Sequence, residues 1–170
     1  MSRINGILSD DWIEENHPNN GVFRVYWKDV ITTNWGGATL NPDEGEGLRY
    51  EWEYKDGKRA DGVSKSWYSS GQLKEERTYK NEKRHGSYTF FYENGQKGLE
   101  WNYKDGHQEG LQIVWHENGQ KESEKTYKNG KLDGLVTNWY ENGQKKREYI
   151  YKDGTRITKK VWSKDGKQRW

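Results

Sequence analysis

The 170-residue chain has no cysteine and only two prolines, Pro18 and Pro42. The absence of cysteine excludes disulfides, thiolate nucleophiles and cysteine-ligated zinc sites. No apolar run is long enough to span a bilayer, and the first residues lack the apolar stretch of a signal peptide. From these absences we expect a soluble, cytoplasmic protein without a transmembrane segment.

Aliphatic side chains are also scarce, since hydrophobic residues of all kinds make up 29% of the sequence and charged residues 33%. This polarity alone would suggest disorder, but disordered chains are poor in aromatic residues. Here 10 tryptophans and 12 tyrosines are present, and each large ring can bury roughly 150–250 Å². A few large rings suit a thin, extended sheet better than a compact globule with an aliphatic core.

The central feature of the sequence is an internal repeat. Gly62, Gly86, Gly110 and Gly134 follow one another at intervals of 24 residues, and each opens a similar segment. A fixed interval of this length is the signature of an array of supersecondary units. Three further columns recur at the same interval: Trp67, Phe91, Trp115 and Trp139; Tyr68, Tyr92, His116 and Tyr140; Tyr79, Tyr103, Tyr127 and Tyr151.

Each repeat carries two turn signals. The first is an Asn-Gly pair such as Asn94-Gly95, with Ser70-Gly71 as the weaker member of this column, and the second is a pair such as Asp105-Gly106. These pairs are preferred in two-residue type I′ hairpins, whose central residues both need positive φ. The segments between them are rich in aromatic residues, Thr and Val, which favours strands. Asn81-Glu82 breaks the second column, so we expect that turn to be strained or differently shaped.

The repeat divides the chain into two parts. Residues 1–46 are predicted to form an N-terminal cap and insertion loop, with a short helix near 10–15 and a strand over 22–27. Residues 47–170 are predicted to form the repeat array, with full repeats at 62–85, 86–109, 110–133 and 134–157 and partial repeats at 47–61 and 158–170. The expected fold is all-β: an elongated single-layer antiparallel β-meander of β-hairpin repeats with an irregular N-terminal cap.

This array resembles the MORN repeat, and the likeness is carried by residues 127–134 (YKNGKLDG) and 139–143 (WYENG). MORN repeats commonly have a second glycine two places after the first, where this chain has Ser64, Tyr88, Gln112 and Val136. It is therefore more similar to the bacterial variant, whose members are often described as antitoxins or immunity proteins of toxin–antitoxin systems. The resemblance implies protein scaffolding, self-association or phospholipid binding, and it supplies no catalytic residue.

Pairing the strands outward from the turns predicts which side chains share a face of the sheet. One face would hold the Trp67 column beside a glutamate column, and the opposite face both tyrosine columns; a single bulge would change this assignment. The glutamate column consists of Glu51, Glu76, Glu100, Glu124 and Glu148. Its members would lie roughly 9–10 Å apart, too far to share a cation, so we expect an ion-paired surface without a metal site.

Residues that depart from the repeat average are the candidates for binding a partner. On the face with the tyrosines these are Tyr50, Trp52, Tyr88, Phe90, Leu99 and Trp101. An exposed aromatic patch usually marks an interaction site, and Trp and Tyr are enriched in binding hot spots. The sequence therefore predicts a non-catalytic module of the immunity, antitoxin or inhibitor type that binds another protein, such as a toxin or a defence-system component. The alternative for this patch is that residues 1–46 fold back and cover it.

A second interpretation concerns the basic C-terminal region, where Lys145, Lys146, Arg147, Lys159 and Lys160 lie among aromatic residues. Such interleaving is typical of surfaces that bind nucleic acid or anionic lipid. The alternative is a soluble cap whose edge strand is protected by lysines from aggregation. A third interpretation is a structural repeat that self-associates.

Catalytic motifs are not found in the sequence. The four histidines, His17, His85, His107 and His116, have no metal-ligand spacing, and no nucleophile elbow, phosphate loop or His-Glu-x-x-His motif is present. We therefore expect a protein without enzymatic activity and without a cofactor.

Overall fold

The computed structural model describes residues 3–4, 7–8, 21–26, 32–34, 37–39 and 48–169. The all-β prediction is confirmed: throughout these residues the chain forms strands and turns, without a helix. Membrane-spanning helices are accordingly absent from the described ranges. The strands of the repeat array are β6 (Leu48–Lys55), β7 (Lys58–Arg59), β8 (Gly62–Trp67), β9 (Leu73–Lys80), β10 (Lys83–Phe91), β11 (Lys97–Lys104), β12 (His107–Gln108), β13 (Gly110–Trp115), β14 (Lys121–Lys128), β15 (Lys131–Trp139), β16 (Lys145–Lys152), β17 (Thr155–Trp162) and β18 (Gln168–Arg169).

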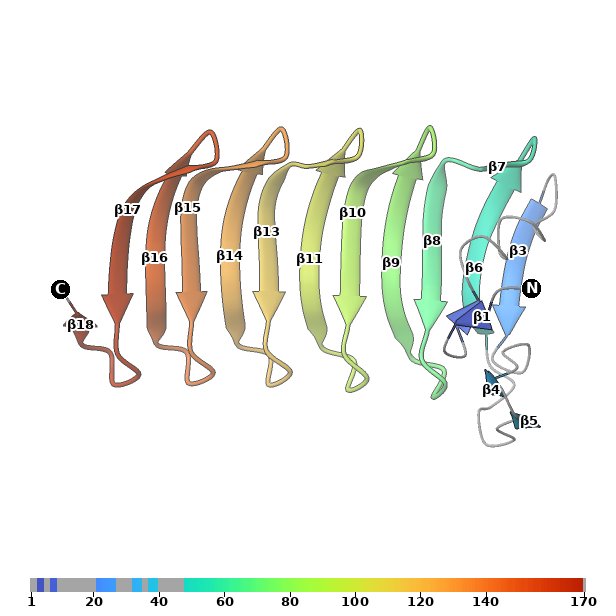
Figure 1. Cartoon of the computed structure of the whole chain (residues 1–170), viewed down its shortest axis with the longest axis horizontal. Helices are drawn as coiled ribbons and strands as arrows, with labels where there is room; N and C mark the ends of the chain where they lie inside the picture. Colours follow the sequence, from blue (N-terminus) through green and yellow to red (C-terminus); the bar gives the residue numbers. More distant parts are fainter. Residues whose placement is uncertain are drawn as a thin grey trace.

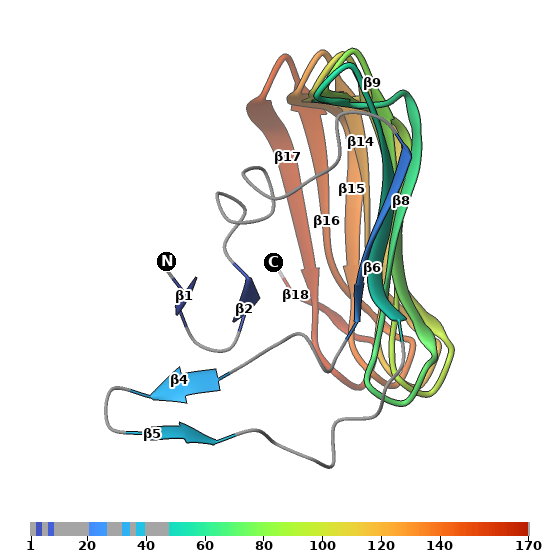
Figure 2. The same ribbon diagram turned by 90° about the vertical axis from the view of Figure 1, so that its right-hand side faces the viewer.

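These strands, preceded by β3 (Gly21–Tyr26), form one antiparallel sheet that follows chain order from β3 at one end to β18 at the other (Figure 1). The short strands β7 and β12 pair with β6 and β11. Seen along its length, the array is a single curved layer of strands (Figure 2). The predicted single-layer meander of 24-residue hairpin repeats is therefore confirmed.

The N-terminal part is described only in pieces. The strand predicted over 22–27 is β3, and its antiparallel partner is β6, with Phe23 opposite Trp52. Two short hairpins join β1 (Arg3–Ile4) to β2 (Ile7–Leu8) and β4 (Thr32–Asn34) to β5 (Gly37–Thr39). The helix predicted near residues 10–15 lies outside the described residues.

The Asp-Gly and Asn-Gly pairs of the second turn column form the predicted type I′ turns. Asp105 and Gly106, for example, have φ of 51° and 87°, as both central positions of this turn require. Asn81 and Glu82 also both have positive φ, 50° and 61°. This turn was expected to be either strained or differently shaped. It keeps the shape of the other turns and is strained, because Glu82 occupies a left-handed position that glycine fills elsewhere.

The first turn column differs from the prediction of a two-residue type I′ turn. The Gly95 amide donates to the Tyr92 carbonyl at 2.9 Å, and the Tyr92 amide donates to the Gln96 carbonyl at 2.8 Å. Only Gly95, and not Asn94, has positive φ, so the loop is a type I turn followed by a left-handed glycine. It is one residue longer than expected because the Asn94 side chain accepts from the Gln96 amide, at 2.9 Å, and stabilises a different turn.

A β-bulge at Gly98 compensates for this extra loop residue. Phe91 lies opposite Lys97 and Phe90 opposite Leu99, so Gly98 is the unpaired residue between them. Near the second turn, at the opposite ends of the strands, β15 has two additional residues between the pairs Tyr127–Leu132 and Lys125–Val136. Neither irregularity changes which face a side chain occupies, since the first cancels the longer loop and the second has an even number of residues.

Side-chain hydrogen bonds connect each repeat to the next. The Tyr68 hydroxyl donates to the Phe91 carbonyl and the Tyr92 hydroxyl to the Trp115 carbonyl. Each acceptor lies 23 residues further on, at 2.8 Å. The Asn94 and Asn118 amides donate to the carbonyls of the following repeat in the same way. These ladders explain why the tyrosine and asparagine columns recur, and they supply cohesion that a thin sheet cannot obtain from a deep core.

Candidate functional site

Cross-strand pairing sorts the side chains onto two faces. Tyr88 lies directly opposite Trp101 and Phe90 opposite Leu99, on the face that also holds the Tyr79, Tyr103, Tyr127 and Tyr151 column. We call this the tyrosine face. Glu76, Glu100, Glu124 and Glu148 lie on the opposite face, which we call the glutamate face. The predicted division of columns between faces is confirmed by this register.

Strands β10 and β11 bring four of the predicted site residues into one group. The Tyr88 and Trp101 rings meet edge to face with centroids 5.8 Å apart, and Phe90 contacts Tyr92 in the same way at 5.5 Å. Leu99 lies opposite Phe90, and all of these side chains are half-buried. We call Tyr88, Phe90, Leu99 and Trp101 the aromatic cluster.

Charged residues on β9 and β10 border the aromatic cluster. The Arg77 guanidinium forms a 2.7 Å ion pair with Glu75 and lies over the Tyr88 ring at 5.1 Å, while the Tyr88 hydroxyl donates to Glu75 at 3.0 Å. Burial, together with the Glu75 carboxylate, raises the pKa of Tyr88. Burial opposes the charge of Arg77, but Glu75 and Tyr88 outweigh it and raise its pKa. The phenol therefore stays neutral and the guanidinium stays charged, which fixes a polar rim beside the rings.

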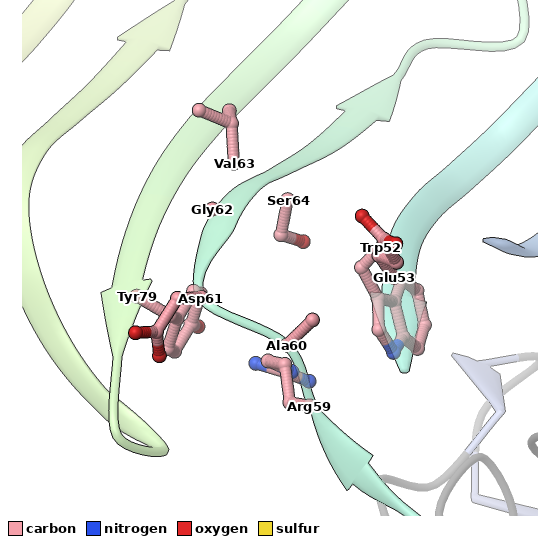
Figure 3. A pocket seen from close by; sticks show the side chains of 9 residues that line it. All are labelled: Trp52, Glu53, Arg59, Ala60, Asp61, Gly62, Val63, Ser64 and Tyr79. Carbon is pink, nitrogen blue, oxygen red and sulfur yellow. The ribbon is translucent and has the colours of Figure 1, made fainter. Parts of the chain in front are cut away.

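Tyr50 and Trp52, the other two predicted partner-binding residues, belong to a separate group on the same face. Strands β8 and β9 separate them from the aromatic cluster. Trp52 is only 4% exposed. Arg59 lies between the rings of Trp52 and Tyr79, 5.4 and 4.5 Å from their centroids, beside a hollow of about 40 Å³ (Figure 3). The six residues thus form two groups, of which the aromatic cluster is the more accessible.

Comparison with family models matches residues 60–81, 84–105, 108–129 and 132–153 to the MORN repeat variant. The chain belongs to the MORN repeat variant family. Repeats of this kind are generally protein-binding or structural modules. A comparison with curated proteins gives no match.

On the glutamate face, the MORN repeats place a lysine beside every member of the glutamate column from Glu76 onward. The pairs are Lys65–Glu76, Lys97–Glu100, Lys121–Glu124 and Lys145–Glu148, at 2.5 to 3.1 Å. Lys121 and Lys145 also lie over the Trp139 and Trp162 rings. Nowhere in the described part of the chain do three His, Cys, Asp or Glu side chains form a group that could hold a metal ion.

The five basic residues predicted as an alternative site do not share one face of the MORN array. Lys145 and Lys160 lie on the glutamate face, where both form ion pairs with Glu148 at 2.8 and 3.5 Å. Arg147 and Lys159 lie on the tyrosine face, opposite Val161 and Tyr149. Lys146, at the bulge of its repeat, lies over the Tyr140 ring at 5.4 Å.

Sequence reasoning missed two basic residues on the tyrosine face, Lys125 and Arg156. Lys125 occupies the column of Trp101 and Tyr149, so its face could have been assigned from the 24-residue interval. Arg156 lies over the Tyr149 ring at 5.6 Å. It lies opposite Tyr151, in the second pair out from the Asp153-Gly154 turn, so its face could also have been assigned from the sequence. The unpaired Ile157 lies beyond it and changes the face of Lys159 instead.

Proposed function

We propose that this MORN protein is a non-catalytic binding module of the inhibitor, antitoxin or immunity type, and that it binds one partner protein through the aromatic cluster. The observation that carries this proposal is the uneven distribution of rings along the tyrosine face. In the columns of Tyr88, Phe90 and Trp101, the next repeat has Gln112, Val114 and Lys125. The sheet therefore does not need these rings to form, and a binding role accounts for them.

The physical properties of the cluster support recognition of a protein. Its rings are held by each other and by the Arg77–Glu75 pair, so little side-chain freedom is left to lose when a partner binds. Large aromatic side chains with a charged rim are the usual composition of interface hot spots. A rigid surface of this kind suits a protein that inhibits its partner by covering part of the partner's surface.

The test is a pull-down from nuclease-treated host lysate with the tagged full chain and a repeat-swap variant. The variant carries Tyr88→Gln, Phe90→Val, Leu99→Ser and Trp101→Lys, the residues that the next repeat has in the same columns. Because the fold accepts those residues one repeat later, the variant is expected to keep its β-sheet circular dichroism. We expect a protein captured by the wild type to be lost.

A matched control changes the other face by a similar amount. Trp115 and Trp139 on the glutamate face are replaced by Phe, the residue found at position 91 of the same column, and capture is expected to persist. Equal capture by the repeat-swap variant and the wild type would contradict the proposal. For the inhibitor role, the captured protein should lose its own activity when the wild type is added in equal amount, and keep it with the repeat-swap variant.

A further inference from the structure

The tyrosine face of β14 to β17 carries cations that are not neutralised. Five basic side chains lie there, which we call the basic strip: Lys125, Lys146, Arg147, Arg156 and Lys159. None of them forms an ion pair with a carboxylate of the described residues. Glu122, the unpaired residue at the bulge of its own repeat, lines a hollow of about 170 Å³ with Lys146 and Arg147 but forms an ion pair with neither.

On the opposite side of the same strands, the lysines beside the glutamate column are paired. Lys121, Lys145 and Lys160 project from β14, β16 and β17 onto the glutamate face, and each is paired with Glu124 or Glu148. Lys128 and Lys131, which lie opposite each other beside the turn, are the lysines of this side that form no ion pair with a described carboxylate. Because side chains alternate along a strand, the unpaired cations in the middle of β14, β16 and β17 lie on the tyrosine face.

Tyrosine rings lie between these cations. A row of opposed residues crosses the four strands in the order Lys125, Val136, Tyr149 and Lys159. Tyr149 contacts Tyr151 with ring centroids 6.1 Å apart, and both rings are half-buried. The strands are adjacent in the sheet (Figure 1), so cations and rings form one continuous surface.

We propose that the basic strip binds single-stranded nucleic acid, with the phosphates against Arg147, Arg156 and Lys159 and a base stacked on Tyr149. Proteins that bind single strands combine a positively charged track with aromatic rings on which bases stack. The bases of a single strand are exposed and can stack on rings of an open sheet. Reading the bases of a double helix instead requires an element that enters a groove. This site is separate from the aromatic cluster, and the inference does not depend on the proposed function.

The distribution of apolar side chains argues against a membrane as the anionic surface. Binding to a lipid interface combines basic residues with apolar side chains that enter the acyl region. Three aliphatic side chains of these strands are exposed. Leu135 and Ile150, 48% and 44% exposed, lie on the glutamate face, and Ile157, 63% exposed, is the unpaired residue next to Arg156. Apart from the single residue Ile157, the basic strip therefore offers charge and tyrosine rings without an exposed aliphatic side chain to insert.

The test is fluorescence anisotropy with a labelled oligothymidylate of about 20 nucleotides and the full chain at about 50 mM salt. The variant Arg147→Gln/Lys159→Gln removes two cations from the basic strip. Its matched control, Lys145→Gln/Lys160→Gln, removes two cations of the same strands, β16 and β17, from the glutamate face. We expect the first pair to weaken binding about tenfold or more and the second to change it less than about twofold. Circular dichroism is used to check that both variants fold.

A second comparison tests the stacking. Tyr149→Leu is expected to weaken oligothymidylate binding at least about fivefold, with Tyr149→Phe close to wild type, while binding of polyphosphate, which has no bases, should be unaffected by either change. The affinity for oligothymidylate should also fall with salt, with a log–log slope of about −2 to −4 for three to five phosphate contacts.

Three results would overturn this inference: no oligothymidylate binding at low salt, an equal loss in both charge pairs, or indifference to Tyr149→Leu. Binding to phosphatidylserine vesicles without oligothymidylate binding would assign the strip to a membrane instead. The repeat-swap variant of the aromatic cluster should bind the oligonucleotide normally, so that failure here is distinguishable from failure of the protein-binding proposal.

Discussion

Gly98 and Phe90 occupy complementary positions on the tyrosine face. A Cβ atom added to Gly98 would lie 2.6 Å from Cδ1 of the Phe90 ring, well inside van der Waals contact. The other repeats have Lys74, Glu122 and Lys146 at this bulge, and smaller residues, Ser66, Val114 and Asn138, in the column of Phe90. The Phe90 ring therefore fits only because Gly98 has no side chain, and the two residues differ from those of the other repeats as a pair.

We predict that Gly98→Lys lowers the free energy of unfolding by about 1–3 kcal/mol, because the new side chain must displace the Phe90 ring from its place. The double variant Gly98→Lys/Phe90→Ser should recover most of the loss, since it reproduces the residues found one repeat earlier. Urea unfolding of the wild type, both single variants and the double variant gives the coupling energy. Additive effects of the two substitutions would show that the ring does not depend on the glycine.

His116 interrupts the tyrosine ladder. Tyr68, Tyr92 and Tyr140 each donate a hydroxyl hydrogen bond to the carbonyl of Phe91, Trp115 or Trp162 in the next repeat. His116 makes no such bond, and its buried Nε2 atom has no hydrogen-bond partner. We predict that His116→Tyr stabilises the protein by about 1 kcal/mol, the usual contribution of one such bond. Thermal and urea unfolding measure the gain, and Tyr68→Phe, which deletes the equivalent bond, should produce a loss of similar size.

The strained turn at Asn81-Glu82 offers a second stabilising substitution. Glu82 has a φ of 61°, in a column where the other turns have glycine. Glu82→Gly should stabilise the protein by roughly 1 kcal/mol, because glycine adopts this conformation without steric cost. The lost ion pair between Glu82 and Lys58 is exposed and long, at 3.6 Å, and should matter little. The reverse change, Gly106→Glu, serves as the control; if it were neutral in urea unfolding, strain would not be the cause.

The glutamate face should make a small contribution to stability that depends on pH. The Lys145 ammonium bonded to Glu148 holds the pKa of this carboxyl below its usual value. A lowered pKa in the folded state stabilises the fold above the ordinary glutamate pKa, near 4.3, and this stabilisation is lost as the pH falls through the folded value. A double-mutant cycle of Lys145→Met and Glu148→Gln should give a coupling of about 0.3–1 kcal/mol at neutral pH that fades below about pH 4. A coupling that persists at pH 2 would rule out an ionic origin.

Most of the fold could be predicted from the sequence because the 24-residue interval and the turn pairs fix where each strand begins. The faces were assigned correctly although the loop at Asn94 was not, because the longer loop and the bulge at Gly98 cancel. Asn94 misled the prediction because its side chain bonds the Gln96 amide and favours a type I turn. The face of Lys159 was beyond sequence reasoning, because it depends on the single unpaired residue Ile157.

The candidate site was predicted in part for a similar reason. Columns identify Tyr88 and Trp101 as neighbours across two strands, and the register bears this out. A repeat column shows which face a residue occupies but not how many strands separate two residues. Trp52 was therefore grouped with Tyr88 and Trp101, although two strands lie between them. Trp52 is 4% exposed, and a periodic pattern carries no information about the burial of one member of a column.

The ladder bonds have a consequence for how such a protein can change over generations. Asn94 reaches the Glu117 carbonyl as Asn118 reaches that of Glu141 and Asn142 that of Lys164, so three successive joints between repeats share the same hydrogen bond. An unequal exchange between two copies of the coding segment would lengthen or shorten the chain by one whole repeat and keep this bond at the new joint. The aromatic cluster lies within residues 86–109. A lineage could therefore duplicate, move or discard its recognition surface in one genetic event, without having to find a new fold to carry it.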